Sequence, residues 1–280
     1  MPPIQRSRPP SRDLPGAPTT AFSGTALPLD VDGIQTSLDV LRAEAADLWA
    51  VIGVETSGCG FLPDRRVKIL YERHVFSRLT RRRFDAKYPS ISNPTPGGYG
   101  AGGAQQYDRL ALAIARNRKA ALQSCSWGVG QVMGYHAEGL GFADVDAMVA
   151  RMGDSENAQF EAMARFIKAS GLDGALRTHD WPRFASGYNG PNYRINNYDT
   201  RLAALHEQLS RGALPDLRVR AAQVYLTFLG HDPRGVDGIM GRMTRAAMND
   251  YQAAQAMPLT DFVDDATFAA LRRDCGPASP

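Results

Sequence analysis

Apolar side chains recur at steps of three and four residues along most of the chain, a spacing that places them on one face of an α-helix. The first such stretch runs from Ile34 to Ile52, with Asp30 or Asp32 placed to cap its start and Gly53 at its end. Further stretches of this kind occupy residues 104–122, 144–152, 155–169, 180–187 and 197–209. The pattern therefore predicts a mainly α-helical fold without a large sheet.

Residues 56–100 interrupt this pattern. Glycine and proline recur throughout the segment, and its one short apolar run is Val67–Tyr71. Such a run between turn residues is typical of a β-strand. We therefore expect a small β-hairpin region here, surrounded by ordered loop.

Two changes in composition divide the chain. Residues 1–30 hold seven of the eighteen prolines and almost no large apolar side chains before Leu27, which is typical of a flexible tail. A polar connection ending at Pro215 precedes about sixty residues with three helical patterns. These breaks predict three parts: a flexible tail at 1–30, a helical domain at 31–210 and a small three-helix domain at 215–273.

Composition excludes several classes of protein. The 280 residues are 44% apolar and 22% charged, which argues against global disorder. The longest unbroken apolar run, residues 48–54, is much shorter than the ~20 residues of a transmembrane helix, so no membrane insertion is expected. A net charge of +3 without a nucleic-acid-binding motif predicts no nucleic-acid partner.

Glu55 is the first candidate for catalysis. It follows the predicted helix directly, and the partial negative charge of a helix C-terminus disfavours ionisation of a nearby acid. Partial burial would raise its pKa further, which suits a general acid that must hold a proton near neutral pH. Taken alone, the position of Glu55 favours a solvated residue after a helix over a catalytic acid.

Three short motifs change that interpretation, because they resemble motifs of the lysozyme-like superfamily and occur in the same order. They are Glu55-Thr56-Ser57-Gly58, Ser126-Trp127-Gly128-Val129-Gly130-Gln131-Val132-Met133-Gly134 and Gly187-Tyr188-Asn189-Gly190-Pro191. More closely, residues 34–208 resemble the N-acetylmuramidase domain of bacteriophage endolysins, whose pattern also includes segments similar to Lys68–His74 and Pro94–Tyr99. The resemblance implies a lysozyme-like helical domain.

The same resemblance implies a glycoside hydrolase that cleaves the β-1,4 bond between N-acetylmuramic acid and N-acetylglucosamine. Glu55 would then be the general acid. Glu72 is the first candidate for a second carboxylate and Asp85 the second, while an ion pair with a neighbouring arginine such as Arg73 stays an alternative for Glu72.

Several side chains near these motifs are candidates for binding the glycan. Their polar groups suit sugar hydroxyls and amides, and their rings suit pyranose faces; Trp127 is equally suited to the core. The candidates are Ser126, Trp127, Gln131, Tyr188, Asn189 and Tyr193.

The C-terminal segment resembles the peptidoglycan-binding type 1 domain over residues 216–272. The matching positions are Gln223, Gly230, Val236–Gly241, Thr244, Ala247, Tyr251, Gln252, Phe262–Thr267 and Leu271. The resemblance implies that this domain anchors the protein to bacterial peptidoglycan and does not cut it.

Other activities fit less well. The five histidines are scattered, without a His-Glu-x-x-His motif, which argues against a zinc amidase or peptidase; we therefore predict no metal and no cofactor. A lytic transglycosylase, which cuts the same bond but leaves anhydro-muramic ends, stays an alternative, as does a non-catalytic wall-binding protein.

The N-terminus shows no basic segment followed by an apolar core, so no secretory signal is expected. With the endolysin resemblance, this predicts a protein made in the bacterial cytoplasm that acts on the wall after release into the periplasm. Nothing in the sequence requires more than a monomer. Cys59 and Cys125 flank the first two motifs, and buried thiols are favoured over a disulfide between them.

Overall fold

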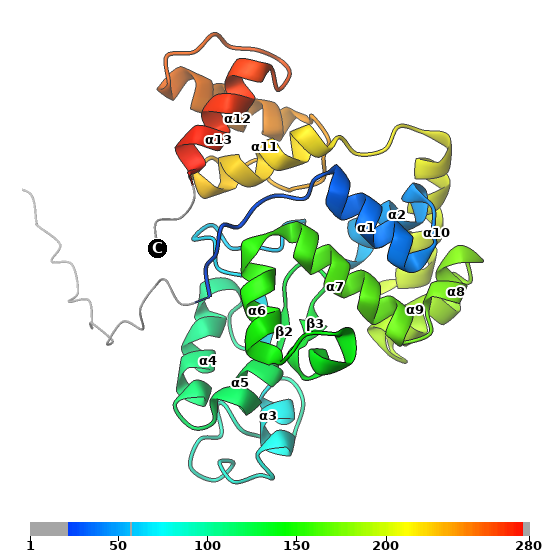
Figure 1. The fold of residues 1–280 in the computed structure, drawn as a ribbon, viewed down its shortest axis with the longest axis vertical. Helices are drawn as coiled ribbons and strands as arrows, with labels where there is room; N and C mark the ends of the chain where they lie inside the picture. Colours follow the sequence, from blue (N-terminus) through cyan, green and yellow to red (C-terminus); the bar gives the residue numbers. More distant parts are fainter. Residues whose placement is uncertain (1–21, 57, 277–280) are drawn as a thin grey trace, which may run out of the picture.

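Helices dominate the structure, a computed structural model that describes residues 22–56 and 58–276 (Figure 1). The part of the predicted tail at residues 1–21 lies outside the described residues. Among the described residues, no helix is both long and apolar enough to cross a membrane.

The first predicted helix is in fact two helices, α1 (Val31–Leu41) and α2 (Ala45–Glu55). Arg42 adopts a left-handed conformation, with φ of 53°, and ends α1. Glu44 and Asp47 then form a reciprocal capping box that starts α2 in a new direction. Most of α2 is buried, and it ends at Glu55.

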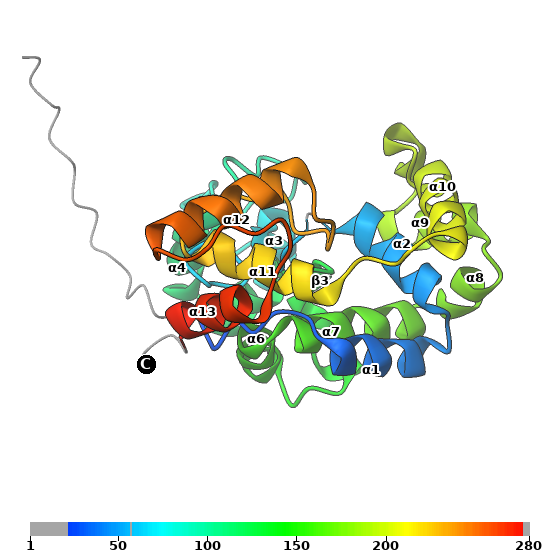
Figure 2. The same cartoon turned by 90° about the horizontal axis from the view of Figure 1, so that it is seen from above.

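The two longest helices of this part, α7 and α10, pack against α1 and α2. Helix α7 packs along α1, and α10 packs along α2 (Figures 1 and 2). The remaining helices of this part are shorter, and several contain only one or two turns. The bounds of these helices are α3 (Arg73–Leu79), α4 (Gln106–Ile114), α5 (Arg118–Gln123), α6 (Val145–Asp154), α7 (Glu156–Ala169), α8 (Asp173–Arg177), α9 (Trp181–Asn189) and α10 (Tyr198–Arg211). Single 3₁₀ turns occupy Gly103–Gln105, Gly134–His136, Glu138–Leu140 and Tyr193–Asn196.

A small antiparallel sheet completes this part of the fold, with strand order β1-β2-β3. The strands are β1 (Ile69–Tyr71), β2 (Cys125–Trp127) and β3 (Val132–Met133), and Ser126 pairs with Leu70 on one side and Met133 on the other. The strand expected at 67–71 is thus present, but the hairpin is formed by β2 and β3. A mainly helical fold with a small β-region is confirmed.

Residues 22–30 differ from the prediction of a tail that extends to residue 30. Ala26 and Leu27 donate backbone hydrogen bonds to the carbonyls of Gly153 and Asp154, at 3.1 and 3.0 Å. Ala26 and Leu29 are almost completely buried. These hydrogen bonds and the burial of small apolar side chains fix the segment at the junction of α6 and α7. The proline content of residues 1–30 gave no indication of this packing.

Three helices form the C-terminal domain, as expected: α11 (Leu217–Phe228), α12 (Arg242–Ala254) and α13 (Asp265–Cys275). Leu226, Met248, Tyr251 and Leu271 are at the centre of a core of its own. All three cysteines are buried free thiols, as favoured for Cys59 and Cys125.

A buried ion pair joins the two domains. Arg220 of α11 contacts Glu156, the first residue of α7, through both carboxylate oxygens, and both side chains are fully buried. Glu156 also accepts the backbone N–H groups of Leu29 and Gly60, each at 3.0 Å, while Arg220 donates to the Gly58 carbonyl at 2.8 Å. Burial alone would raise the pKa of Glu156, but Arg220 and these N–H groups hold it below its usual range.

Replacing Arg220 with alanine should leave the Glu156 charge buried without its partner. We expect the free energy of unfolding to fall by about 3–5 kcal/mol. Urea unfolding followed by tryptophan fluorescence would measure the loss. Arg211→Ala is the matched control, because it removes an exposed pair with Glu207 and should change stability by less than about 1 kcal/mol. An equal effect of the two substitutions would show that the buried pair does not hold the domains together.

Candidate active site

Glu55 is placed by the end of α2. The Thr56 backbone N–H and hydroxyl both donate to the Ile52 carbonyl, at 3.2 and 2.6 Å, and the chain turns into an extended conformation there. Because this double hydrogen bond ends the helix at a fixed residue, the Glu55 side chain leaves the last turn in a defined direction. Glu55 is half-buried.

Asn189 contacts Glu55 directly. Asn189 is the last residue of α9, and its side-chain nitrogen donates to Glu55 Oε1 at 2.8 Å across 134 residues of sequence. Two of the three recognised motifs therefore meet at the carboxyl group. Asn189, a predicted sugar-binding residue, is thus also a direct partner of the candidate acid.

The environment of Glu55 raises its pKa to about 7, chiefly because burial disfavours the charged form. The Asn189 hydrogen bond and the positive charge of Arg201 on α10 act in the opposite direction. The direction is the one expected from the sequence, and burial is its main cause. Arg201 was not identified from the sequence, because no local motif marks it.

The β2–β3 hairpin brings the second motif alongside the third. The Tyr188 hydroxyl donates to the Gly130 carbonyl at 2.9 Å. Ser126 Oγ donates to Gln131 Oε1, and Gln131 Nε2 donates to the Gly128 carbonyl, each at 2.8 Å. These predicted sugar-binding groups thus hold the hairpin and fix it against α9.

A buried glutamine that sequence analysis missed supports the same hairpin. Gln159 of α7 accepts the Val129 N–H at 2.8 Å and donates to the Met152 carbonyl at 2.9 Å. A Cβ atom at Gly60 or Gly128 would lie 1.7 or 2.7 Å from Gln159 Oε1. Both positions therefore need glycine to let this amide approach.

Two of the aromatic candidates lie in the core. Trp127 is fully buried, and its indole N–H donates to the Leu122 carbonyl at 3.0 Å. Tyr193 is 7% exposed, and its hydroxyl accepts from Arg194 Nε at 3.1 Å. Burial favours the core alternative for Trp127, and the low exposure of Tyr193 leaves little of its ring open to a sugar.

The two candidates for a second carboxylate have different surroundings. Asp85 accepts hydrogen bonds from Ser77 Oγ at 3.0 Å and Ser92 Oγ at 2.5 Å, so both of its oxygens connect a loop to α3. Glu72 lies beyond the end of β1 and pairs with His74 at 3.1 Å. The pairing with an arginine considered for Glu72 is therefore replaced by one with histidine.

An apolar cavity of about 680 Å³ lies between α2, α10 and the C-terminal domain. Thr56 and Gly58, which follow Glu55, line one side of it, and the turn Val236–Met240 lines the other. The C-terminal domain thus forms one wall of a cavity that adjoins the end of α2.

The motif residues of the C-terminal domain hold its loops. The amide of Gln223 donates to Asp237 Oδ1 and Thr244 Oγ1 at 2.8 and 3.0 Å, and its oxygen accepts the N–H groups of Asp237 and Gly238, each at 2.9 Å. Gln252 connects Thr260 and Thr267 in the same way, at 2.8 Å each. The positions that carry the resemblance thus define the fold of this domain.

Comparison with known proteins identifies two family models that match successive parts of the chain. The family model for N-acetylmuramidase matches residues 44–210, and the model for a peptidoglycan-binding domain matches residues 216–271. The crystal structure of the Burkholderia AP3 phage endolysin is similar, with 43% sequence identity and a TM-score of 0.62. That similarity covers 64% of this chain and 70% of the endolysin. No curated protein matches the chain.

Removing the Asn189 amide should raise the pKa of Glu55 above its value of about 7, because the hydrogen bond from Asn189 stabilises the carboxylate. NMR titration of the glutamate side-chain carbons would measure the shift in Asn189→Ala. Asn192→Ala is the control, because Asn192 is exposed nearby and contributes its backbone carbonyl to a turn. A pKa that stays unchanged or falls in Asn189→Ala would contradict this account.

Proposed function

The chain belongs to the N-acetylmuramidase family, and from that premise we propose that it hydrolyses the β-1,4 bond between N-acetylmuramic acid and N-acetylglucosamine in peptidoglycan, with Glu55 as general acid. The chain is a glycoside hydrolase, which sets aside the alternative of a non-catalytic wall-binding protein. The observation that carries the role of Glu55 is its raised pKa in a half-buried position.

The surroundings of Glu55 suit both halves of an acid–base cycle. With a pKa of about 7, the carboxyl group is protonated often enough at neutral pH to donate to the glycosidic oxygen as the bond breaks. Once the proton has left, the Asn189 hydrogen bond and the Arg201 charge stabilise the carboxylate. The same carboxylate can then accept a proton from water.

Glu72 is our candidate for a second carboxylate. Both oxygens of Asp85 accept hydrogen bonds from serines, one from Ser77 of α3 and one from Ser92, which supports a structural role for that residue. Glu72 has a side chain that is 14% exposed, so it retains some access to solvent at the end of β1. The separation of the reacting carboxyl groups would decide between retention and inversion.

The C-terminal peptidoglycan-binding domain gives peptidoglycan as the partner. We propose domain limits of 31–210 and 215–273, with residues 22–30 added to the first domain because they pack against α6 and α7. The buried pair of Arg220 and Glu156 fixes the wall-binding domain against the loop after Glu55. Binding and cleavage would therefore share one rigid frame.

The biological setting follows from the structural neighbour. The similar AP3 protein is a phage endolysin, and we propose the same class of role for this chain: release to the periplasm and lysis of the wall by a monomer. Nucleic acid has no place in this proposal.

Glu55→Gln tests the catalytic assignment. The amide keeps the shape of the side chain but has no acidic proton, so we expect glycan cleavage to fall by about 10²–10⁴-fold. Mass spectrometry of fragments from purified peptidoglycan would measure it, with wild-type fragments carrying reducing muramic ends. Binding to insoluble peptidoglycan should be unchanged.

Glu207→Gln is the control for this substitution, since Glu207 is an exposed carboxylate on α10 and should retain full activity. Cleavage by Glu55→Gln at the wild-type rate would refute the role of Glu55. Anhydro-muramic ends from the wild-type protein would make the enzyme a lytic transglycosylase instead.

The rate should also depend on pH through Glu55. Because the acid must be protonated, we expect kcat to decrease as the pH rises through about 7, roughly tenfold for each further unit. Asn189→Ala should move this limb to higher pH, because it removes a group that lowers the pKa. A limb that is the same in both proteins would assign it to another group.

A further inference from the structure

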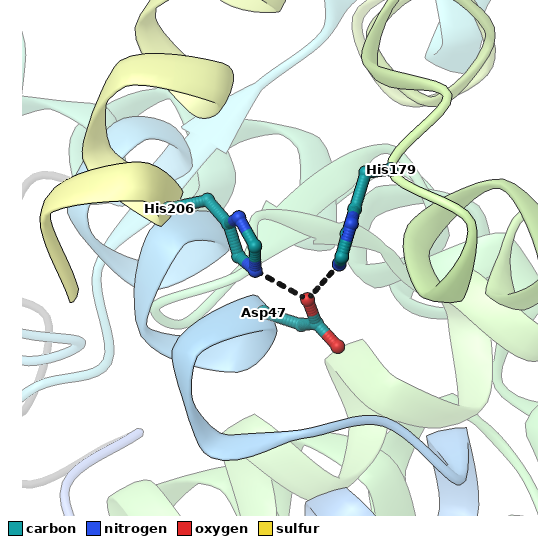
Figure 3. A group of neighbouring side chains, drawn as sticks. All are labelled: Asp47, His179 and His206. Atoms are coloured by element: carbon teal, nitrogen blue, oxygen red, sulfur yellow. Dashed lines mark hydrogen bonds and ion pairs between the residues drawn. The ribbon is translucent and has the colours of Figure 1, made fainter. Parts of the chain in front are cut away.

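Three side chains from distant parts of the sequence converge at the opposite end of α2 from Glu55. Asp47 lies in the first turn of α2, His206 lies on α10, and His179 lies in the turn before α9. His179 Nε2 is 2.9 Å and His206 Nε2 is 3.1 Å from the same oxygen, Asp47 Oδ1. Figure 3 shows both rings directed at that oxygen.

The carboxylate is held in place before any ligand arrives. The side chain of Asp47 is 3% exposed, and its other oxygen, Oδ2, accepts the Glu44 backbone N–H at 2.9 Å. This hydrogen bond belongs to the capping box of α2, so the start of the helix fixes the carboxyl plane. Oδ1 is thereby presented to the two imidazoles.

Aromatic packing holds the two imidazoles in position. Trp181 stacks on His179 at 5.4 Å with an interplanar angle of 18°, and it also contacts His206 at 5.3 Å. The two histidine rings are 4.1 Å apart. The Trp181 ring thus restricts both imidazoles, and the capping box restricts the carboxylate. Such packing around the ligands is typical of metal sites.

We propose that Asp47, His179 and His206 bind a zinc ion. Two imidazole nitrogens and one carboxylate oxygen are ligands that zinc accepts, and three such atoms here lie within 4.8 Å of one another. In a tetrahedral site with bonds of ~2.0–2.2 Å, neighbouring ligand atoms are ~3.3 Å apart. The observed 2.9 and 3.1 Å need to widen by only a few tenths of an ångström.

The chemistry of the site favours zinc over magnesium or calcium, since those cations prefer sets of oxygen ligands. Each Nε2 would offer its lone pair to the metal, with the ring proton on Nδ1, and His206 Nε2 would exchange its 3.2 Å contact with Ser210 Oγ for the metal. The His179 side chain is 45% exposed, so the open side of the site admits zinc from solvent and leaves a fourth position for water.

The metal would act as a structural cross-link. Asp47 and Glu55 are eight residues apart on α2, or about 12 Å along the helix, too far for the ion to touch the reacting bond. However, the helices it would join are the ones that carry Glu55, Asn189 and Arg201. Zinc would therefore stabilise the helices that determine the surroundings of the acid.

Zinc binding can be tested on the full-length chain after its metals have been removed with a chelator. When zinc is added back and the excess is dialysed away, we expect the wild-type protein to retain one zinc ion per chain. Its Tm should rise with added zinc but not with added magnesium. Cobalt in place of zinc should give the visible absorption of a tetrahedral site.

Two substitutions remove one ligand each. His179→Asn suits the left-handed backbone at this position, where φ is 56°, and His206→Gln preserves the helix. Each should weaken zinc binding by at least the 10–100-fold typical of losing a second-shell partner, and should abolish the zinc-dependent rise in Tm. His231→Ala, a histidine of the C-terminal domain, is the control and should bind zinc like the wild type.

Circular dichroism of the zinc-free variants would confirm that they are folded. The proposal is wrong if the wild-type protein retains no zinc. It is equally wrong if the two ligand variants retain zinc as tightly as His231→Ala. Both outcomes are independent of hydrolytic activity, so they leave the role of Glu55 to its own test.

Discussion

The ion pair between Arg220 and Glu156 is the contact on which the arrangement of the whole molecule depends. Removing two charges from water is expensive, and it is tolerated only where each charged group is almost fully hydrogen-bonded. Glu156 meets this demand with Arg220 and the N–H groups of Leu29 and Gly60. Arg220 meets most of it with Glu156 and the Gly58 carbonyl, and its Nε has no hydrogen-bond partner among the described residues. The pair therefore orders the N-terminal segment, the loop after Glu55 and the C-terminal domain at one point.

Glu55 does not touch the pair and lies three residues before Gly58, whose carbonyl accepts from Arg220. Its pKa is raised by burial, and the burial is created by elements that meet around the end of α2. Asn189 arrives on α9 and Arg201 on α10, and both moderate the effect of burial. A group poised near neutral pH thus results from opposing influences of several helices. The proposed zinc site would join those helices at their other end.

The sequence predicted the components better than their contacts. Helical periodicity and glycine positions gave the fold class and the three-helix C-terminal domain, because they reflect local backbone preferences. The motifs identified Glu55 and Asn189 but not that one donates to the other across 134 residues. Gln159, Arg220 and the His179–His206 pair act through tertiary contacts, so no local spacing marks them. For Trp127 the sequence left glycan contact and core packing open, and only the tertiary structure shows that the ring is buried in the core.

The position of Arg220 also bears on how such enzymes recombine. A genetic crossover in the connection between α10 and α11 would exchange the wall-binding domain as a unit. It would interrupt neither helix, so the sequence alone would indicate no cost. The incoming domain would need an arginine at the equivalent turn of its first helix. Without it, the Glu156 carboxylate would remain buried without a partner of opposite charge. We therefore expect an exchanged domain that lacks this arginine to lower the stability of the product, unless the recipient has lost Glu156.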